Sequence, residues 1–478
     1  MSTERTARQD AIEGWNPQAL QDNTVAVTGN GPITGFTIAY LAGLNFKNIR
    51  LFSSGATDFR IAQDRESLVS LVKDLSPEIN IESINRPPLE DDMYLKDIDI
   101  IVDTSNQPYF KDRNFKNAKR YAKSFISASS SSTKASIVME NFSRASSPLE
   151  KVIMNKKNTL QRKSDAPFRK IDYHMHEFEK YRQGITTSSA IAALVTDKIR
   201  SAIMPLKEEN NKGGMHHEFS YETSNLEKEL YDKKVLLVGA GGVGTYIAMN
   251  CALSNIAEMH IADHDTVSIS NLNRQILYRE NDAFNNHNKA EAICQSLNDL
   301  KPAIYKPIPK KISKEDESWI RAENYDLIFS APDNPSTRKE LDEIAYAAGI
   351  PLINGGITPF SSTMERYIPG KTACLNCQNE HYEAQIRYFN EYLETLSCAT
   401  MQESNVVVTN AFLGALMTEE ALKYFNGKDL PFNTKTEFSI ENNYKLINTP
   451  VERCTYCSDN PCECQETITH EPKKKKVF

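Results

Sequence analysis

KKVLLVGAGGVG, residues 233–244, is the stretch that decides the fold. A hydrophobic run typical of a β-strand leads into a glycine-rich turn, and an alanine-rich helix pattern follows. Glycines at such a turn let backbone N–H groups approach phosphate oxygens, and the N-terminus of the next helix favours an anion. The glycines are Gly239, Gly241, Gly242 and Gly244. The pattern predicts a Rossmann-type nucleotide site in an α/β fold, with Asp263 at the distance of a ribose ligand.

Length and composition are those of an ordinary globular protein. The 478 residues are 40% hydrophobic and 25% charged, which is enough to form two or more domains. A net charge of −7 gives no nucleic-acid signature, and no apolar run reaches the roughly 18 to 20 residues of a membrane helix. The polar start MSTERTARQD lacks the apolar region of a signal peptide. We therefore expect a cytoplasmic protein that binds neither nucleic acid nor membrane.

The strand, glycine turn, helix and strand pattern of residues 233–265 occurs a second time, in residues 23–55. An offset of 210 residues aligns Gly29 with Gly239, Gly31 with Gly241, Pro32 with Gly242, Thr34 with Gly244 and Ser53 with Asp263. The first copy keeps the pattern of the fold but loses two of the four glycines and the acid that nucleotide binding needs. We interpret it as a degenerate copy.

Two further matches extend this repeat in the same order. Residues 97–107 resemble 325–335, and aligning Asp99 with Asp326 places Asn106 opposite Asp333. The helix pattern of 188–203 resembles that of 410–425. These matches predict an inactive half over 1–205, a linker over 206–230, an active half over 231–457 and a tail over 458–478. The alternative is that two Rossmann-like folds share generic patterns without a joint function.

The run DHDTVSISNLNRQ, from Asp263 to Gln275, resembles the signature of the E1-like family, and ordinary dehydrogenases, the alternative NAD-dependent class, do not carry it. This family includes ubiquitin-activating enzymes and the molybdopterin- and thiamine-pathway adenylyltransferases. The resemblance continues at Lys289, PDNPSTR (332–338), NGGI (354–357), CLNC (374–377) and SCAT (397–400). It implies two E1-type adenylation folds that form a pseudodimer within one monomeric chain. The segment between Arg274 and Lys289 is longer than in bacterial members.

Carboxylate activation explains why these residues occur together. The site must neutralise the phosphates of ATP while the α-phosphate stays reachable. Arg274, Lys289 and the glycine loop are the expected phosphate ligands, and Asp263 the expected ribose ligand. Asn271 is expected to fix the loop, and Asp333 to bind Mg²⁺. The alternatives are surface charges for Arg274 and Lys289, a helix cap for Asn271 and a turn residue for Asp333.

The N-terminal RTARQ resembles the RxxRQ element of the same family, with Arg5, Arg8 and Gln9 in place. In that family the second arginine reaches across a dimer interface into the ATP site of the partner. The resemblance therefore implies that Arg8 of the inactive half completes the site of the active half. The alternative is a solvated arginine.

Two CxxC pairs predict a metal site. Cys374, Cys377, Cys454 and Cys457 supply four thiolates, which can close a tetrahedral Zn²⁺ site without an open position. Such a zinc is structural, and the resemblance implies the same. Redox chemistry is the alternative. All nine cysteines occur at or after Cys251, which suits metal binding better than disulfides.

Cys398 is set apart from both pairs, shortly before a helix pattern that begins near 405. A cysteine ahead of a helix N-terminus can have a lowered pKa. The resemblance implies the thioester-forming nucleophile of a compact activating enzyme for a ubiquitin-like protein, which passes its product to an E2-like conjugating enzyme. The alternatives are a sulfur-carrier-protein adenylyltransferase without a thioester step, a NAD-dependent oxidoreductase and a non-catalytic E1-like subunit.

Overall fold

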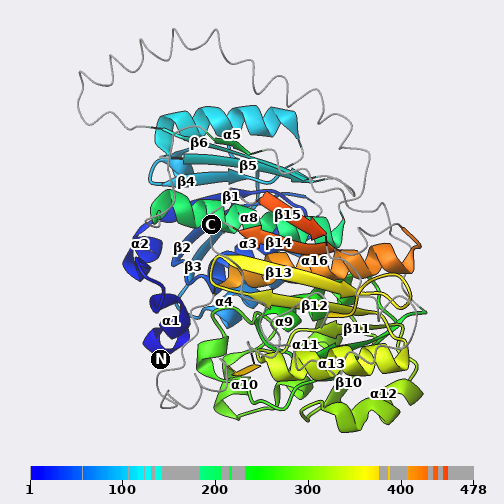
Figure 1. Ribbon diagram of the computed structural model, residues 1–478. Helices are drawn as coiled ribbons and strands as arrows, with labels where there is room; N and C mark the ends of the chain where they lie inside the picture. Colours follow the sequence, from blue (N-terminus) through cyan, green and yellow to red (C-terminus); the bar gives the residue numbers. More distant parts are fainter. Residues whose placement is uncertain are drawn as a thin grey trace, which may run out of the picture.

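Two mixed β-sheets with helices between and around them make up the protein (Figure 1). The computed structural model describes residues 2–55, 57–105, 107–122, 124–130, 135–142, 184–205, 215–217, 232–375, 386–387, 406–428, 434–439 and 445–450. The predicted α/β class with two Rossmann-like sheets is confirmed. Among the described residues, no helix has both the length and the apolar composition needed to cross a bilayer.

The first sheet has seven strands in the order β3-β2-β1-β4-β5-β6-β7. Its strands are β1 (Thr24–Thr28), β2 (Asn48–Phe52), β3 (Asn80–Ile84), β4 (Ile100–Asp103), β5 (Ser124–Ser130), β6 (Ala135–Asn141) and β7 (Met215–His217). The pairings from β3 to β5 are parallel, while β6 and β7 are antiparallel. The residues 215–217 fall within the segment expected as a linker, where they pair with β6 and extend the first sheet.

The second sheet has eight strands in the order β10-β9-β8-β11-β12-β13-β14-β15. Its strands are β8 (Lys234–Val238), β9 (Glu258–Ala262), β10 (Ile304–Ile308), β11 (Leu327–Ser330), β12 (Leu352–Ile357), β13 (Ser361–Tyr367), β14 (Thr434–Ser439) and β15 (Lys445–Pro450). Parallel pairing again extends over the first five strands in spatial order, and antiparallel strands follow. The two sheets therefore have the same strand order over seven positions.

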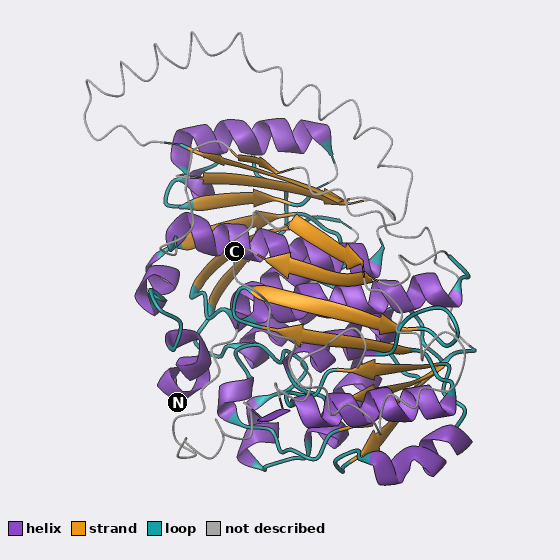
Figure 2. Ribbon diagram, in the orientation of Figure 1, coloured by secondary structure: helices purple, strands orange, loops and turns teal. Residues whose placement is uncertain are grey.

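Helices that the sequence repeat aligns occupy equivalent places. α3 (Pro32–Gly43) and α9 (Gly242–Leu253) each have 12 residues and each follow the first strand of their sheet. α8 (Ile185–Ile203) and α16 (Val407–Phe425) each have 19 residues. These four helices form a layer between the sheets (Figures 1 and 2), and their apolar residues belong to one continuous core.

Side-chain contacts join the two halves across this layer. α8 packs against α16, where the Thr186 hydroxyl donates to Glu419 Oε2 at 2.6 Å. The Tyr40 ring of α3 meets the Tyr246 ring of α9 edge-on, with centroids 5.6 Å apart. Because both contacts are buried, the halves are packed as one body and not as separate globules.

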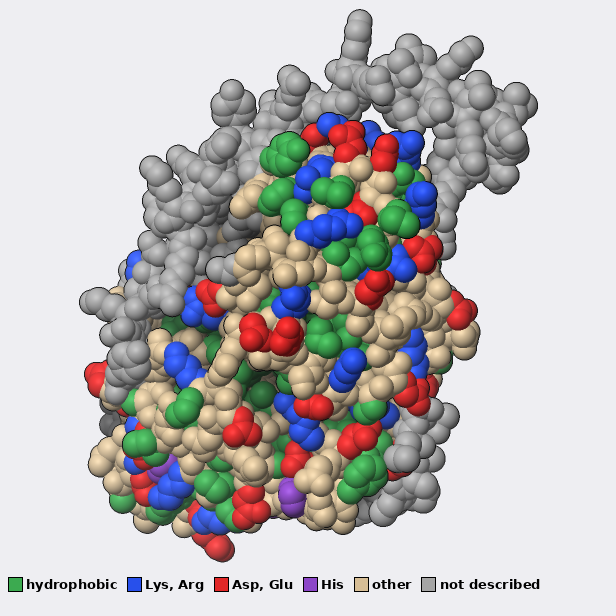
Figure 3. Space-filling model, turned by 180° about the vertical axis from the view of Figure 1, so that it is seen from behind, with side chains coloured by type: hydrophobic (Ala, Val, Ile, Leu, Met, Phe, Trp, Pro, Cys, Tyr) green, Lys and Arg blue, Asp and Glu red, His purple; other side chains and the backbone are tan. Residues whose placement is uncertain are grey.

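The remaining helices lie beside this layer or on the other faces and edges of the sheets. They are α1 (Ser2–Asp10), α2 (Pro17–Asp22), α4 (Arg65–Leu75), α5 (Pro108–Tyr121), α10 (Glu280–Phe284), α11 (Lys289–Leu300), α12 (Glu317–Ala322) and α13 (Pro335–Ala348), with short 3-10 helices η1 (Met93–Leu95), η3 (Ile269–Asn271) and η4 (Lys314–Asp316). On the face shown in Figure 3, basic and acidic side chains are interspersed.

Candidate active site

The glycine turn connects β8 to α9, and each glycine meets a different constraint. Gly239 has a φ of +95°, and a Cβ there would lie 2.5 Å from the Ala331 carbonyl oxygen. A Cβ at Gly244 would collide with the Gly239 carbonyl, and one at Gly242 with the Asn410 side chain. At Gly241, by contrast, a Cβ would meet no atom within 4 Å. The turn is therefore tightly packed against Ala331 and Asn410, and only Gly241 has open space where a side chain would project.

Asp263 lies directly after β9 and beside this turn. Its carboxylate accepts the Ala240 N–H at 2.7 Å and the Asp265 N–H at 2.9 Å. Burial raises the pKa of Asp263, although the Lys289 charge and the two N–H donors oppose that shift. The predicted ribose ligand is thus held against the glycine turn.

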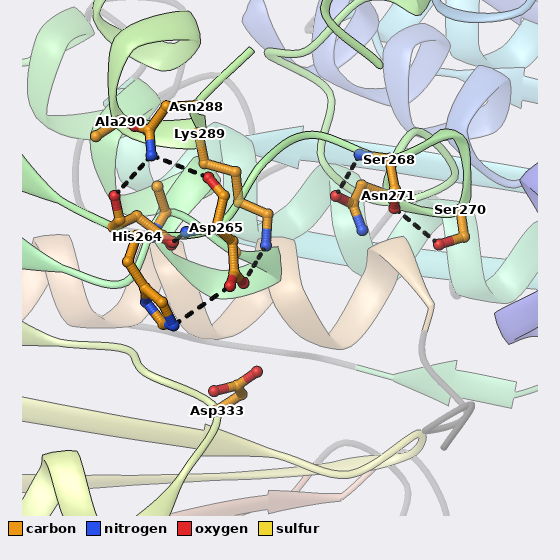
Figure 4. A network of polar contacts seen from close by, with 12 residues as sticks. His264, Asp265, Ser268, Ser270, Asn271, Asn288, Lys289, Ala290 and Asp333 are labelled. Atoms are coloured by element: carbon orange, nitrogen blue, oxygen red, sulfur yellow. Dashed lines mark hydrogen bonds and ion pairs between the residues drawn. The ribbon is translucent and has the colours of Figure 1, made fainter. Parts of the chain in front are cut away.

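Lys289 joins the same cluster as the first residue of α11. Its ammonium lies 2.8 Å from Asp265 Oδ2, and only 8% of the residue is exposed (Figure 4). Burial opposes ionisation of Asp265, yet the Lys289 charge and hydrogen bond lower its pKa overall. Asn288 caps α11 and donates to the carbonyls of Asp263 and Asp265, each at 3.1 Å.

Asn271 closes the 3-10 helix η3. Its side-chain oxygen accepts the Ser268 N–H at 3.1 Å, and only 4% of the residue is exposed (Figure 4). The expected role of fixing the loop and the alternative of a helix cap therefore describe the same contact.

Arg274 follows η3 and is 5% exposed. Its guanidinium donates to the Ser270 carbonyl at 2.8 Å and to Asn273 Oδ1 at 2.9 Å. The Arg274 carbonyl accepts a hydrogen bond of 2.8 Å from the Tyr246 hydroxyl of α9. Burial of Arg274 and Lys289 excludes the alternative that they are surface charges.

Asp333 lies in the loop after β11, with an exposed side chain. Figure 4 shows its carboxylate separate from the hydrogen-bonded network around Lys289. The loop contacts the glycine turn through Ala331, whose N–H donates to the Val238 carbonyl at 2.9 Å. Arg338 of α13 holds the same loop by donating to the Pro332 carbonyl at 2.5 Å.

The N-terminal helix α1 packs against η3 of the other half. Arg5 lies 3.3 Å from Glu280 Oε1, and burial lowers the pKa of Arg5 despite that carboxylate. Gln9 donates to the Gly43 carbonyl at 3.1 Å. The backbone of Arg8 lies between these contacts, and its side chain lies outside the described part of the structure.

Most of the predicted cysteine sites lie outside the described residues. Cys377, Cys398, Cys454 and Cys457 belong to that group, so their roles stay predictions. Cys374 is described, and it is buried, with 4% of the residue exposed. The next residue, Leu375, donates its N–H to Asp342 Oδ1 at 3.0 Å, which fixes this segment to α13.

Sequence reasoning missed several polar partners of the site. Asp265 and Asn288 lie in or beside quoted motifs, so charge pairing and helix-capping rules could have identified them. Tyr246, Tyr278 and Arg338 act on backbone carbonyls of other segments, and no sequence pattern shows such contacts. They are visible only in the folded chain.

A glycine turn between β8 and α9, with buried charged residues beside it, is typical of a Rossmann-type fold. Residues 216–465, more than half of the chain, match the ThiF family. The chain belongs to the ThiF family and is an E1-like protein, as its motifs predicted.

Curated relatives match parts of the chain. A Saccharomyces cerevisiae protein named "Ubiquitin-activating enzyme E1-like" is 37% identical over 31% of this chain and 23% of its own length. The Drosophila melanogaster "Nedd8-activating enzyme E1 catalytic subunit" is 30% identical over 36% and 40%. The Arabidopsis thaliana "Adenylyltransferase and sulfurtransferase MOCS3" is 26% identical over 51% of each chain. The chain thus spans about half or less of the length of these relatives.

Among solved structures, Escherichia coli MccB crystallised with ATP has a similar fold. The match has a TM-score of 0.42 and 23% identity, and it covers 49% of this chain and 69% of that chain.

Proposed function

We propose that the protein uses ATP to adenylate the C-terminal glycine carboxylate of a ubiquitin-like protein. In this proposal residues 231–457 form the active half and residues 1–205 an inactive half, together a pseudodimer in one chain. The observation that carries it is the cluster at one end of the second sheet: the glycine turn with Asp263, Lys289 and Asp265. Arg274 belongs to the same sequence motif as Asp263 and Asp265, and it is buried as well.

The turn fits the phosphates of a nucleotide. Gly241 is open on the side where a Cβ would project, and it precedes α9, a helix of 12 residues. Unpaired N–H groups at a helix N-terminus carry partial positive charge and bind anions. Lys289 adds a full charge beside the turn, and Asp263 supplies a carboxylate for ribose hydroxyls.

The reaction needs little covalent participation by the protein. A carboxylate oxygen of the substrate attacks the α-phosphorus, the bond to the bridging oxygen breaks, and pyrophosphate leaves. Arg274 and Lys289 would stabilise the negative charge that develops on the phosphates. Asp333 would hold Mg²⁺, which neutralises phosphate charge when bound; its exposed carboxylate is a suitable hard-oxygen ligand.

The inactive half would contribute Arg8. Support comes from α1, which packs on η3 and pairs Arg5 with Glu280 of the other half. An arginine on this helix is therefore near the segment that leads to Arg274. Arg8→Ala should lower adenylation sharply without unfolding the protein.

Thioester formation on Cys398 and transfer to a conjugating enzyme form the second part of the proposal. In this step the thiolate attacks the acyl adenylate, a thioester bond forms and AMP leaves. Names of relatives as ubiquitin-, NEDD8- and SUMO-activating enzymes support it. A structural zinc on Cys374, Cys377, Cys454 and Cys457 belongs to the same proposal.

A sulfur-carrier-protein adenylyltransferase without a thioester is the second candidate. It is favoured by two relatives that bear the name "Adenylyltransferase and sulfurtransferase", one of which matches 251 residues.

One experiment separates these candidates. The protein is incubated with small β-grasp proteins and Mg²⁺-ATP, pyrophosphate exchange is measured, and wild type and Cys398→Ala are compared on non-reducing gels. A thiol-sensitive adduct that the variant lacks supports the thioester. Exchange without an adduct in either protein supports the sulfur-carrier reaction, and no exchange with any partner contradicts both.

A further inference from the structure

Tyr278 is a fully buried tyrosine between two parts of the site. Its hydroxyl donates to the Ala240 carbonyl at 2.6 Å, and the Lys289 carbonyl is a second acceptor at 3.3 Å. Burial raises the pKa of Tyr278 well above its usual value, so the hydroxyl keeps the proton that it donates. One side chain thus contacts both the glycine turn and the start of α11.

The contact to Ala240 fixes the orientation of the next peptide group. A trans peptide places the carbonyl of one residue antiparallel to the N–H of the following residue, and the described chain has no cis peptide bond. Because the Ala240 carbonyl points to Tyr278 in the interior, the Gly241 N–H points the opposite way. The Ala240 N–H is also fixed, by its 2.7 Å bond to Asp263.

The opposite side of this peptide is free to bind a ligand. Gly241 is partly exposed, and a Cβ there would meet nothing within 4 Å. Among the residues that the structure describes, none accepts the Gly241 N–H. This N–H also lies at the N-terminus of α9, where an anion is favoured.

We propose that Tyr278 is a positioning residue that directs the Gly241 N–H at a phosphate oxygen of a bound nucleotide. The inference rests on the proposed function, because it assumes that ATP binds at this turn. By its contact with the Lys289 carbonyl, the same hydroxyl keeps the start of α11 beside the turn. Tyr278 itself touches no part of the nucleotide.

The test compares ATP with adenosine, which lacks phosphates. Both affinities are measured by titration calorimetry, with weak adenosine binding followed by competition, for wild type and Tyr278→Phe. Loss of one aligned hydrogen bond to a charged group should raise the Kd for ATP about tenfold, which corresponds to about 1.4 kcal/mol. The Kd for adenosine should stay unchanged, because adenosine makes no phosphate contact.

Tyr305→Phe is the matched control. Tyr305 is also buried, and its hydroxyl also donates to a backbone carbonyl, that of Lys301 at 2.8 Å, but it has no contact with the glycine turn. The Tyr305→Phe variant loses the same kind of hydrogen bond, so any general effect of that loss on stability or binding appears in both variants. We expect wild-type affinity for both ligands in Tyr305→Phe.

Gly241→Pro tests the second link directly and also serves if Tyr278→Phe does not fold. Proline removes the N–H itself, and the φ of −79° at Gly241 lies in the range of proline. The variant should weaken ATP and spare adenosine, and the double variant should bind ATP no more weakly than Gly241→Pro.

Four outcomes would overturn the positioning role: wild-type ATP affinity in Tyr278→Phe, equal weakening of both ligands, unchanged ATP affinity in Gly241→Pro, or additive losses in the double variant. If the wild type itself binds no ATP, the proposed function fails first, and that result is distinct from these four.

Discussion

The glycine turns after β1 and β8 each connect a strand to a helix, but different residues surround them. In the first half, Asn30 occupies the place of Ala240, and its side chain exchanges hydrogen bonds with the backbone of Ser54 at 2.5 and 3.1 Å. Its carbonyl accepts the Asp58 N–H at 2.8 Å. The first turn is thus bonded to Ser54 and Asp58 of its own half, whereas the second is bonded to Asp263 and Tyr278 and has open space beside Gly241.

Substitutions around the first turn complete the difference. Pro32 stands at the place of Gly242, and Ser53 at the place of Asp263. The hydroxyls of Thr34 and Thr104 are hydrogen-bonded to each other at 2.7 Å, next to Gly29. The first half therefore keeps the strand order and the helix layer without an acid at the place of Asp263. The fold tolerates the loss of the site because packing, not the ligand, holds the sheet together.

A second pair of equivalent residues, Lys111 and Arg338, also differs between the halves. Lys111 Nζ donates to the Ser127 hydroxyl at 2.8 Å and the Ala128 carbonyl at 3.0 Å, and Asp103 lies 3.6 Å away. Arg338 makes the corresponding contacts with Asn354 at 2.8 Å and Gly355 at 2.5 Å, and it also reaches Pro332. Both contact sets stabilise a strand of their own sheet, and the second also holds the loop of Asp333.

The largest effect is expected from Lys289→Ala. Loss of the buried charge beside the glycine turn should slow ATP–pyrophosphate exchange about a thousandfold, the upper range for one electrostatic contact in a transition state. The rate of exchange at saturating substrate checks this. Lys47→Ala is the control, because Lys47 also pairs with a carboxylate, Glu78, but in the first half. Exchange within a few-fold of wild type in Lys289→Ala would contradict the assignment.

Lys111→Met should act on stability and not on activity. Asp103 is fully buried, and without the lysine it keeps only its neutral partners, so the free energy of unfolding should fall by about 3 kcal/mol. Denaturant unfolding measures the loss. Exchange per folded molecule should equal that of wild type, and a specific loss of exchange would show that this first-half residue serves the reaction.

Arg338→Met should act on the magnesium requirement. The Pro332 carbonyl, one residue before Asp333, loses its donor, so Asp333 is held less firmly. We expect a roughly tenfold higher Mg²⁺ concentration for half-maximal exchange, equal to about 1.4 kcal/mol. The Mg²⁺ dependence of Lys111→Met serves as the comparison, and the same dependence in both variants would refute a role for Arg338 at Asp333.

No effect on the number of ATP sites is expected when the glycine and the aspartate of the second turn are introduced into the first half. Pro32→Gly with Ser53→Asp should create no second ATP site, because Asn30 would still tie the turn to Ser54 and Asp58. Titration calorimetry should give one ATP per chain before and after the change. Two ATP molecules per chain would mean that Pro32 and Ser53 are what prevents the first half from binding ATP.

Sequence patterns predicted the fold class and most of the charged cluster. Gly239, Asp263 and Lys289 lie in motifs whose spacing reflects strand and helix lengths, so their convergence follows from the topology. The equal lengths of α3 and α9, and of α8 and α16, show why the repeat could be read without a structure.

Contacts between distant segments could not be predicted in this way. The chain after Arg274 folds back so that the Tyr278 hydroxyl reaches Ala240, which is 38 residues away in sequence. The partner of Arg5, Glu280, is 275 residues away. Periodicity and motif spacing describe local structure, and such long-range hydrogen bonds depend on the packing of the whole core.

The central claim is that the glycine turn of the second half, and not that of the first, holds the nucleotide. Photolabelling with an azido analogue of ATP, followed by peptide mapping, tests it most directly. We predict label in peptides from residues 232–375, none in peptides from residues 24–130, and loss of label with excess ATP or in Lys289→Ala. Label in residues 24–130 that ATP displaces, or undiminished label in Lys289→Ala, would contradict the account.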